Sequence, residues 1–186
     1  MQLSNTSVGY GLLSIVVHWV AALAVFGMFA LGFWMVDLTY YSEWYQRAPD
    51  IHRSVGVLLF CLMVFRLLWR LFATVPDPLV GHKRWEVLSA RLAHGLLYVL
   101  VFVAMVSGYL ISTADGSSVS VFGWFEVPSV TGQIKRLEDT AGLVHYWSTW
   151  ALIALALIHS AGALKHHFID RDKTLRRMLI PECRDN

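Results

Sequence analysis

The chain has 186 residues, of which 56% are hydrophobic and only 15% are charged. Its mean hydropathy of +0.54 is too high for an ordinary soluble domain. Its formal net charge of +2 gives no reason to expect a nucleic-acid partner. The apolar residues come in long blocks rather than in amphipathic stripes, and this arrangement indicates helices that cross a membrane.

Four segments are long enough to span a membrane, since a helix needs roughly 20 mostly apolar residues to cross a hydrocarbon layer about 30 Å thick. Each must be helical, because a strand or loop would leave its backbone amides unsatisfied in lipid. The sequence therefore predicts an all-α membrane protein, a bundle of four transmembrane helices in a single domain over 1–186. The predicted spans cover residues 12–36, 51–73, 91–112 and 142–165.

The basic residues predict which side of the membrane each connection faces. The connections 37–50 and 113–141 contain only three Lys or Arg residues between them, whereas the middle connection and the C-terminal tail are rich in them. Because basic connections stay in the cytoplasm, we expect both termini and the middle connection there. The connection 113–141 would then be periplasmic. It is rich in Gly and Ser, and it is either a folded cover or a mobile lid.

The two cysteines predict no disulfide and no metal site. Cys61 lies within the second predicted span and Cys183 in the C-terminal tail, so they are too far apart to pair. The sequence has no CxxC pattern or Cys–His cluster, so any metal chemistry belongs to histidine.

Four of the eight histidines form pairs at two depths of the predicted bundle. His145 and His159 are fourteen residues apart in the fourth span, a spacing that places them on one helix face and about 21 Å apart along the axis. His18 lies near the cytoplasmic start of the first span, and His52 lies at the periplasmic start of the second. Depth therefore pairs His18 with His159, and His52 with His145.

Each pair offers two imidazoles on different helices, which is the ligand set of a six-coordinate haem iron. Helical bundles hold such cofactors in their cores. A single buried histidine would equally well be a hydrogen-bonded structural residue, although ionisable groups inside a membrane are rare and usually functional. Four histidines at matched depths instead predict two haems per chain, in preference to structural histidines or a proton relay.

The same spacing of fourteen residues identifies one residue on each of the first two spans. Gly32 follows His18 and lies at the periplasmic depth, where a missing side chain would let a flat macrocycle lie against the helix. Tight helix packing explains this glycine equally well. Arg66 follows His52 and lies at the cytoplasmic depth. We interpret it as the partner of a haem propionate, in preference to an arginine that snorkels to the lipid headgroups.

Two more residues near the predicted haems are candidates for cofactor binding. His94 lies near the cytoplasmic end of the third span. It is an alternative iron ligand, but we interpret it as a hydrogen-bond donor to a propionate or as part of a quinone pocket, and an interfacial histidine is equally consistent. Arg53 is interpreted as the partner of an outer propionate. With Arg47 it would also form a positive region that attracts an anionic reactant.

Several segments resemble the bacterial cytochrome b-561 family. They are "SIVVHWV" around His18, "IHRSVG" around His52, "VFRLLWR" around Arg66, the His145/His159 pair and the closing "LKHHFIDRDKTLRRM". The resemblance covers nearly the whole chain and preserves order and spacing. It implies a four-helix, di-haem protein of the bacterial inner membrane. One haem b would be bound by His18 and His159 on the cytoplasmic side, the other by His52 and His145 on the periplasmic side.

The resemblance also implies a function in electron transport. The family is similar to the membrane cytochrome subunits of hydrogenases and formate dehydrogenases, which pass electrons between a partner and quinone. One branch is associated with superoxide oxidation at the periplasmic face, coupled to ubiquinone reduction. We therefore expect an oxidoreductase that links quinone to a small periplasmic electron donor or acceptor. The alternatives are a haem-containing anchor for a partner redox protein and a haem-free transporter or structural bundle.

The quinone is expected at the cytoplasmic interface, because its reduction takes up protons and histidine titrates near neutral pH. The polar groups expected there are His94, Lys165, His166 and His167. The alternative is a periplasmic site at Asp37, Arg53 and the aromatic residues from Trp34 to Tyr45. No conventional catalytic nucleophile or base is predicted, and His82, His166 and His167 are not assigned to iron.

Overall fold

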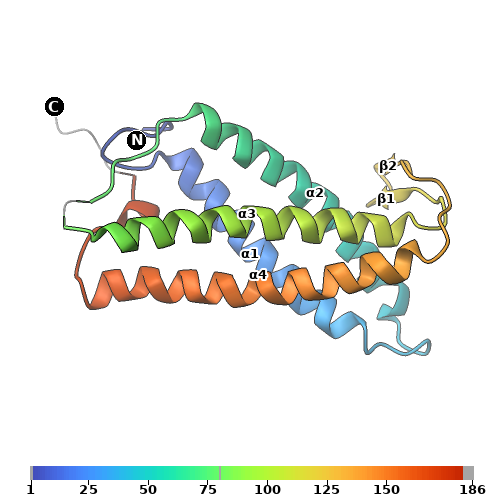
Figure 1. The fold of residues 1–186 in the computed structure, drawn as a ribbon. Coiled ribbons are helices and arrows are strands. Elements are labelled where there is room, and N and C mark those ends of the chain that lie inside the picture. Colours follow the sequence, from blue (N-terminus) through green and yellow to red (C-terminus); the bar gives the residue numbers. More distant parts are fainter. Residues whose placement is uncertain (1, 80, 182–186) are drawn as a thin grey trace. The chain divides into compact units, whose positions relative to one another are not determined.

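Long helices dominate the part of the chain that the structure describes. The computed structural model describes residues 2–79 and 81–181, so Cys183 lies outside it. Four helices are long and apolar enough to cross a membrane (Figure 1), which confirms the predicted all-α class with four spans. Their bounds are α1 Leu12–Met35, α2 Trp44–Phe72, α3 Arg84–Ser112 and α4 Leu137–Phe168.

Three of these helices begin before the predicted spans. α2, α3 and α4 start at residues 44, 84 and 137, where the sequence predicted starts at 51, 91 and 142. Hydropathy marks the part of a helix that lies in hydrocarbon, whereas backbone hydrogen bonding continues into the polar interface. At the start of α3, a carboxylate oxygen of Glu86 accepts a hydrogen bond from the backbone N–H of Lys83 at 2.9 Å. This contact caps the polar end of the helix.

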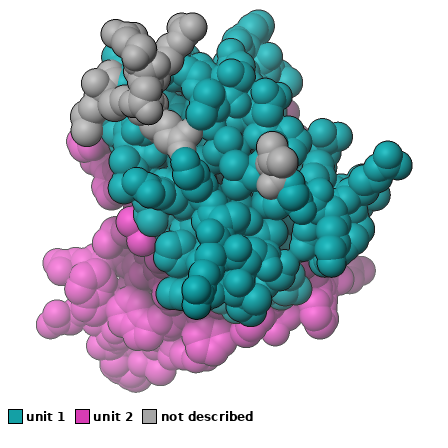
Figure 2. Space-filling view, turned by 90° about the vertical axis from the view of Figure 1, so that its left-hand side faces the viewer, with its two compact units in different colours: residues 1–22, 62–97, 154–186 teal, residues 23–61, 98–153 magenta. Residues whose placement is uncertain are grey.

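The described chain divides into two compact units, and each takes a part of every long helix (Figure 2). Unit 1 comprises residues 1–22, 62–97 and 154–186, and unit 2 comprises residues 23–61 and 98–153. His18 and His159 fall in unit 1, and His52 and His145 fall in unit 2. The two predicted haem levels therefore belong to different units. A single domain over the whole chain stays a prediction.

Hydrogen bonds in unit 1 join three segments that lie outside the spans. Asn5 donates a side-chain hydrogen bond to the carbonyl of Thr74 at 3.0 Å. The backbone N–H of Asp77 donates to the carbonyl of Ser7 at 2.9 Å, and Arg177 donates to the carbonyl of Asp77 at 2.9 Å. The segment before α1, the α2–α3 connection and the segment after α4 therefore contact one another, as the prediction that they share one side of the membrane requires. That this side is the cytoplasm stays a prediction from the basic residues.

The α3–α4 connection in unit 2 is folded, which favours the cover over the mobile lid. Strands β1 (Val119–Val121) and β2 (Phe125–Val127) form an antiparallel hairpin in which Val121 lies opposite Phe125. The hairpin is bound to α2 through the buried Ser54. The Ser54 hydroxyl donates to the carbonyl of Ser120 at 3.3 Å and accepts from the N–H of Phe122 at 3.1 Å.

Much of the surface of the helices is apolar. In the most apolar window of each span, only 11–17% of the residues are buried inside the protein. Leu23 of α1 and Ile158 of α4, for example, are 71% and 68% exposed. A soluble protein would be penalised for exposing so many large apolar side chains, whereas lipid tails solvate them.

Candidate functional site

His52 of α2 and His145 of α4 face each other in unit 2, and we call them the unit 2 pair. Their ring centroids are 6.3 Å apart and their planes are inclined by 79°. Two imidazoles that bind one metal ion from opposite sides, with bonds of about 2 Å, place their centroids about 6 Å apart. The unit 2 pair is therefore spaced for two ligands of a single iron.

The backbone of α3 holds the ring of His145. Nδ1 of His145 lies 2.8 Å from the carbonyl oxygen of Ala104 and 3.3 Å from the hydroxyl of Ser107. Because a carbonyl oxygen only accepts, Nδ1 carries the proton and Nε2 keeps its lone pair. Histidine ligands of metals are commonly held in this way, with the second ring nitrogen donating to a carbonyl or carboxylate.

The ring of His52 carries a buried polar atom that the protein does not satisfy. Its Nδ1 has no hydrogen-bond partner within residues 2–79 and 81–181. Buried ring nitrogens nearly always have a partner, so such an atom requires an explanation. A metal ion bound at this nitrogen would satisfy it, whereas one bound at Nε2 would leave it without a partner.

Two glycines bring bare backbone against these rings. A Cβ atom on Gly32 of α1 would lie 3.1 Å from Cε1 of His52, and one on Gly108 of α3 would lie 3.1 Å from Cε1 of His145. Ordinary van der Waals contacts of a Cβ atom begin at about 3.4 Å. Each ring is thus packed against a helix at a point where a side chain would displace it. The structure places Gly32 against a predicted ligand. That Gly32 makes room for the macrocycle stays a prediction beside the alternative of tight helix packing.

Gly108 is a site residue that the sequence-based prediction missed. It follows His94 on α3 by fourteen residues, which is the spacing that identified Gly32 and Arg66 on the first two helices. The signal was therefore present in the third span as well. With Gly108 included, each of the four helices contributes one residue at each of the two levels.

Four residues, one from each helix, come together in unit 1, and we call them the unit 1 cluster: His18, Arg66, His94 and His159. The rings of His94 and His159 lie edge to face, with centroids 5.0 Å apart. Nδ1 of His18 accepts a hydrogen bond from Nη2 of Arg66 at 2.8 Å. His94 and His159 are also neighbours of His18.

Arg66 and His94 thus each contact one member of the predicted ligand pair His18 and His159. The guanidinium of Arg66 is directed at His18, which is not the position of an arginine that snorkels to the headgroups. Binding of a propionate by either residue stays a prediction. So does the alternative that His94 is itself an iron ligand.

Arg53 lies at an open hollow in unit 2. It forms an ion pair with Asp50, and its side chain is 43% exposed. The two residues line a hollow of about 550 Å³, together with Met35, Val36, Leu38, Tyr45, Gln46 and Pro49. Asp50 offsets part of the positive charge expected from Arg53 and Arg47. Pairing of Arg53 with an outer propionate stays a prediction.

The polar residues expected at a cytoplasmic quinone site take part in different contacts. His94 belongs to the unit 1 cluster. The ammonium group of Lys165 instead lies 2.9 Å from a carboxylate oxygen of Glu86 and 2.6 Å from one of Asp170. Nδ1 of His166 is 2.9 Å from the same oxygen of Asp170. The residues at the end of α4 therefore form an ionic network, and His94 contacts a predicted haem ligand.

Asp172 extends this network beyond the end of α4. Its Oδ2 lies 3.0 Å from Nε2 of His82 and 2.8 Å from Nδ1 of His166. Partial burial raises the pKa of the Asp172 carboxyl, but hydrogen bonds from Thr174, His82 and His166 lower that pKa by more, and it lies below its ordinary value. Asp172 is therefore ionised at neutral pH.

Comparison with known proteins shows similarity along nearly the whole chain. The family model described as "Prokaryotic cytochrome b561" matches residues 9–180. "Cytochrome b561 homolog 2" of Escherichia coli (strain K12) is 49% identical over 179 residues, which cover 96% of this chain and 95% of the relative. "Cytochrome b561 homolog 1" of the same strain is 29% identical, with 89% of this chain and 93% of the relative covered. The "Probable superoxide oxidase CybB" of Yersinia pestis is 27% identical, with 91% and 95% covered.

Proposed function

The chain belongs to the prokaryotic cytochrome b561 family, and from this premise we propose that it holds two b-type haems and exchanges electrons between quinone and a small periplasmic reactant. Membership and the four spans make it a haem-binding, electron-transferring, multi-pass protein of the bacterial inner membrane. The number of haems, their ligands and the two reactants are what we propose in addition.

The observation that carries the proposal is the geometry of the unit 2 pair. The ring separation of 6.3 Å and the hydrogen bond from His145 to Ala104 both fit a haem bound between these rings. Gly32 and Gly108 let α1 and α3 approach them closely. We therefore assign the periplasmic haem to His52 and His145.

The cytoplasmic haem is assigned to His18 and His159. A guanidinium only donates, so its contact with His18 leaves the proton of that ring on Nε2. Binding of iron through Nε2 requires that proton to move to Nδ1, and Arg66 must then turn to another acceptor. A haem propionate is an acceptor of the right charge, which supports the predicted role of Arg66.

Haem, when bound, supplies an iron that takes up and releases one electron at a time. The protein sets how readily it does so. The Ala104 carbonyl makes the His145 imidazole a more basic ligand, which favours the oxidised state. The positive charge of Arg66 favours the reduced state at the other level, since it offsets the added electron.

We place the exchange with quinone at unit 1, next to His94. His94 contacts the predicted ligand His159, and the ionic network of His166, Asp170 and Asp172 lies in the same unit. The hollow at Tyr45, Asp50 and Arg53 is the alternative position. For the periplasmic reactant we propose a small anion such as superoxide, on the printed name of the Yersinia pestis relative and on the arginines Arg47 and Arg53.

Rapid mixing of the purified, haem-loaded protein with quinol, and separately with superoxide, tests the proposal through the absorption spectrum of the haems. We expect each reactant to reduce haem without any added protein. Failure of both would contradict the proposal and favour the haem-containing anchor, whose electrons come from a partner redox protein. His94→Leu should slow reduction by quinol with both haems retained. If Arg53→Leu reacts slowly with quinol and His94→Leu does not, the quinone site lies at the hollow instead.

A further inference from the structure

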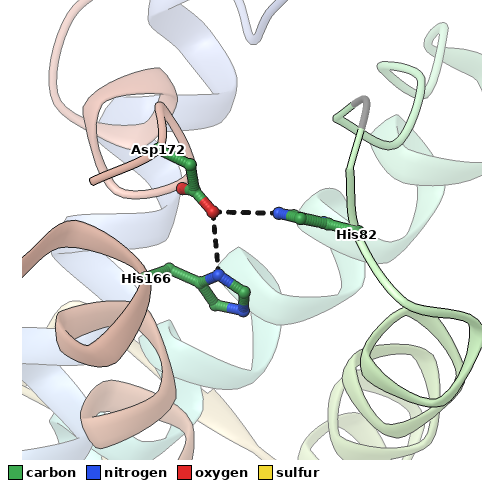
Figure 3. Close-up of side chains that lie close together, drawn as sticks. All are labelled: His82, His166 and Asp172. Carbon is green, nitrogen blue, oxygen red and sulfur yellow. Dashed lines mark hydrogen bonds and ion pairs between the residues drawn. The ribbon is translucent and has the colours of Figure 1, made fainter. Parts of the chain in front are cut away.

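His82, His166 and Asp172 bring three metal-ligating atoms together in unit 1, and none of them is a histidine assigned to haem (Figure 3). His82 comes from the α2–α3 connection, His166 from the last turn of α4, and Asp172 from the segment after it. Nε2 of His82, Nδ1 of His166 and a carboxylate oxygen of Asp172 all lie within 4.8 Å of one another. We propose that these residues bind a divalent metal ion of the zinc type.

The carboxylate of Asp172 is fixed in the orientation that a ligand needs. Its Oδ1 accepts a hydrogen bond from the backbone N–H of Thr174 at 2.7 Å. Its own backbone N–H donates to the carbonyl of His166 at 3.1 Å. One oxygen is thus occupied by the local turn, and the other is directed at the two imidazoles, as Figure 3 shows.

Two of the three donor–donor distances are close to those of a tetrahedral zinc site, and the third, between the two ring nitrogens, is within 4.8 Å. Bonds of about 2.0–2.1 Å place the donors of such a site about 3.3 Å apart. The distances from Asp172 Oδ2 to the two ring nitrogens are 3.0 and 2.8 Å. Donor distances of 3.0 and 2.8 Å need to lengthen by a few tenths of an ångström to admit the ion. Each imidazole then binds the ion through a deprotonated nitrogen and carries its proton on its other ring nitrogen. Two histidines and one carboxylate leave the fourth position to water.

The surroundings carry negative charge and are shielded from solvent. The side chains of His82, His166 and Asp172 are 19%, 17% and 20% exposed. The contacts of this network include three carboxylates, those of Asp172, Asp170 and Glu86, and one ammonium group, that of Lys165. The network therefore attracts a cation. Asp170 keeps its contact with Lys165 when His166 turns from Asp170 to the ion.

The chemistry of the donors favours Zn²⁺. Nitrogen and oxygen donors with no thiolate suit Zn²⁺, and three protein ligands with one open position are a common zinc arrangement. A bound ion would tie the α2–α3 connection to the end of α4. These ligands are separate from the haem ligands, so zinc binding and haem binding are independent claims.

Calorimetric titration of the purified, haem-loaded, full-length protein with Zn²⁺ tests the site. We expect one strong site per chain, and a loss of at least tenfold in affinity in both His82→Ala and Asp172→Asn. His167→Ala is the matched control, because His167 is next to His166 but outside the three-residue group, and it should bind as the wild type does. No stoichiometric binding by the wild type, or unchanged affinity in both variants, would overturn the proposal.

Zinc X-ray absorption of the wild type supplies a second measurement that needs no substitution. The expected shell is nitrogen and oxygen at about 2.0 Å, with the outer scattering of two imidazoles. A sulfur shell, or the spectrum of hydrated zinc, would contradict the assignment. The haem absorption of each variant, recorded before titration, shows that it has folded, and a variant without haem is replaced by His166→Ala or His82→Gln.

Discussion

His145 and His18 differ in the group that holds Nδ1. The carbonyl of Ala104 accepts a hydrogen bond from His145, whereas the guanidinium of Arg66 donates one to His18. The first contact increases the basicity of the ring. Iron binding by His18 ends the second contact, but the guanidinium, turned to a propionate, keeps its positive charge at that level. We therefore expect the two haems to have different reduction potentials, with the higher value at the His18/His159 level.

Replacement of Arg66 by leucine should lower the potential of the His18/His159 haem alone. A unit charge about 10 Å away at an effective dielectric constant of about 20 shifts a potential by roughly 70 mV. Redox titration of the purified protein should show one component shifted by this order of magnitude and the other unchanged. Arg66→Lys keeps the charge and should shift it much less. If the titration curve of the leucine variant matches that of the wild type, Arg66 does not lie close to the haem.

Gly108→Ala should lower the occupancy of the haem on His145. The new Cβ atom would lie 3.1 Å from Cε1 and 3.3 Å from Nδ1 of that ring. His145 must therefore move, and the movement strains its hydrogen bond to the carbonyl of Ala104. Alanine stabilises a helix by about 1 kcal/mol relative to glycine, so helix propensity does not explain a loss. The pyridine haemochrome assay measures the haem content.

Gly95→Ala on the same helix is the control for Gly108→Ala. A Cβ atom at Gly95 would meet nothing within 4 Å in the described part of the chain. This variant should keep the haem content of the wild type. If Gly108→Ala also keeps it, with both potentials unchanged, close packing of α3 on His145 is not needed for haem binding.

At the scale of elements, the apolar length of each segment predicted the four helices, but it did not predict their ends. α2 includes the polar residues from Trp44 to Asp50, which hydropathy assigns to a connection. Its helical conformation there comes from backbone hydrogen bonding, to which hydropathy is insensitive. Spacing likewise identified Gly32, whereas the edge-to-face contact between His94 and His159 depends on tertiary packing and leaves no signal in a single sequence.

The β1–β2 hairpin depends on one buried hydroxyl of α2. Ser54→Ala should leave the N–H of Phe122 and the carbonyl of Ser120 without their partner, at a cost of about 1–3 kcal/mol. We expect faster amide hydrogen exchange at residues 119–127, measured by mass spectrometry. Ser160→Ala is the control, because the Ser160 hydroxyl donates to the carbonyl of Ala156 in its own helix at 2.8 Å and has no other hydrogen bond within residues 2–79 and 81–181. Equal exchange in both variants would show that Ser54 does not dock the hairpin.

At the scale of the whole molecule, the two units divide the predicted ligands into two separate sets. Unit 1 contains His18 and His159, and unit 2 contains His52 and His145. Each unit draws on all four helices, so each can hold its cofactor with its own contacts. If both assignments are right, loss of a ligand in one unit should leave the haem of the other unit in place.

The haem-to-protein ratio of the wild type, His145→Ala and His159→Ala, measured by the pyridine haemochrome assay, tests this claim most directly. The wild type should hold two haems per chain, and each variant should hold one. Redox titration should then show that the haem kept by His145→Ala is the one whose potential responds to Arg66→Leu. Loss of both haems in both variants, or of neither, would contradict two independent bis-histidine sites.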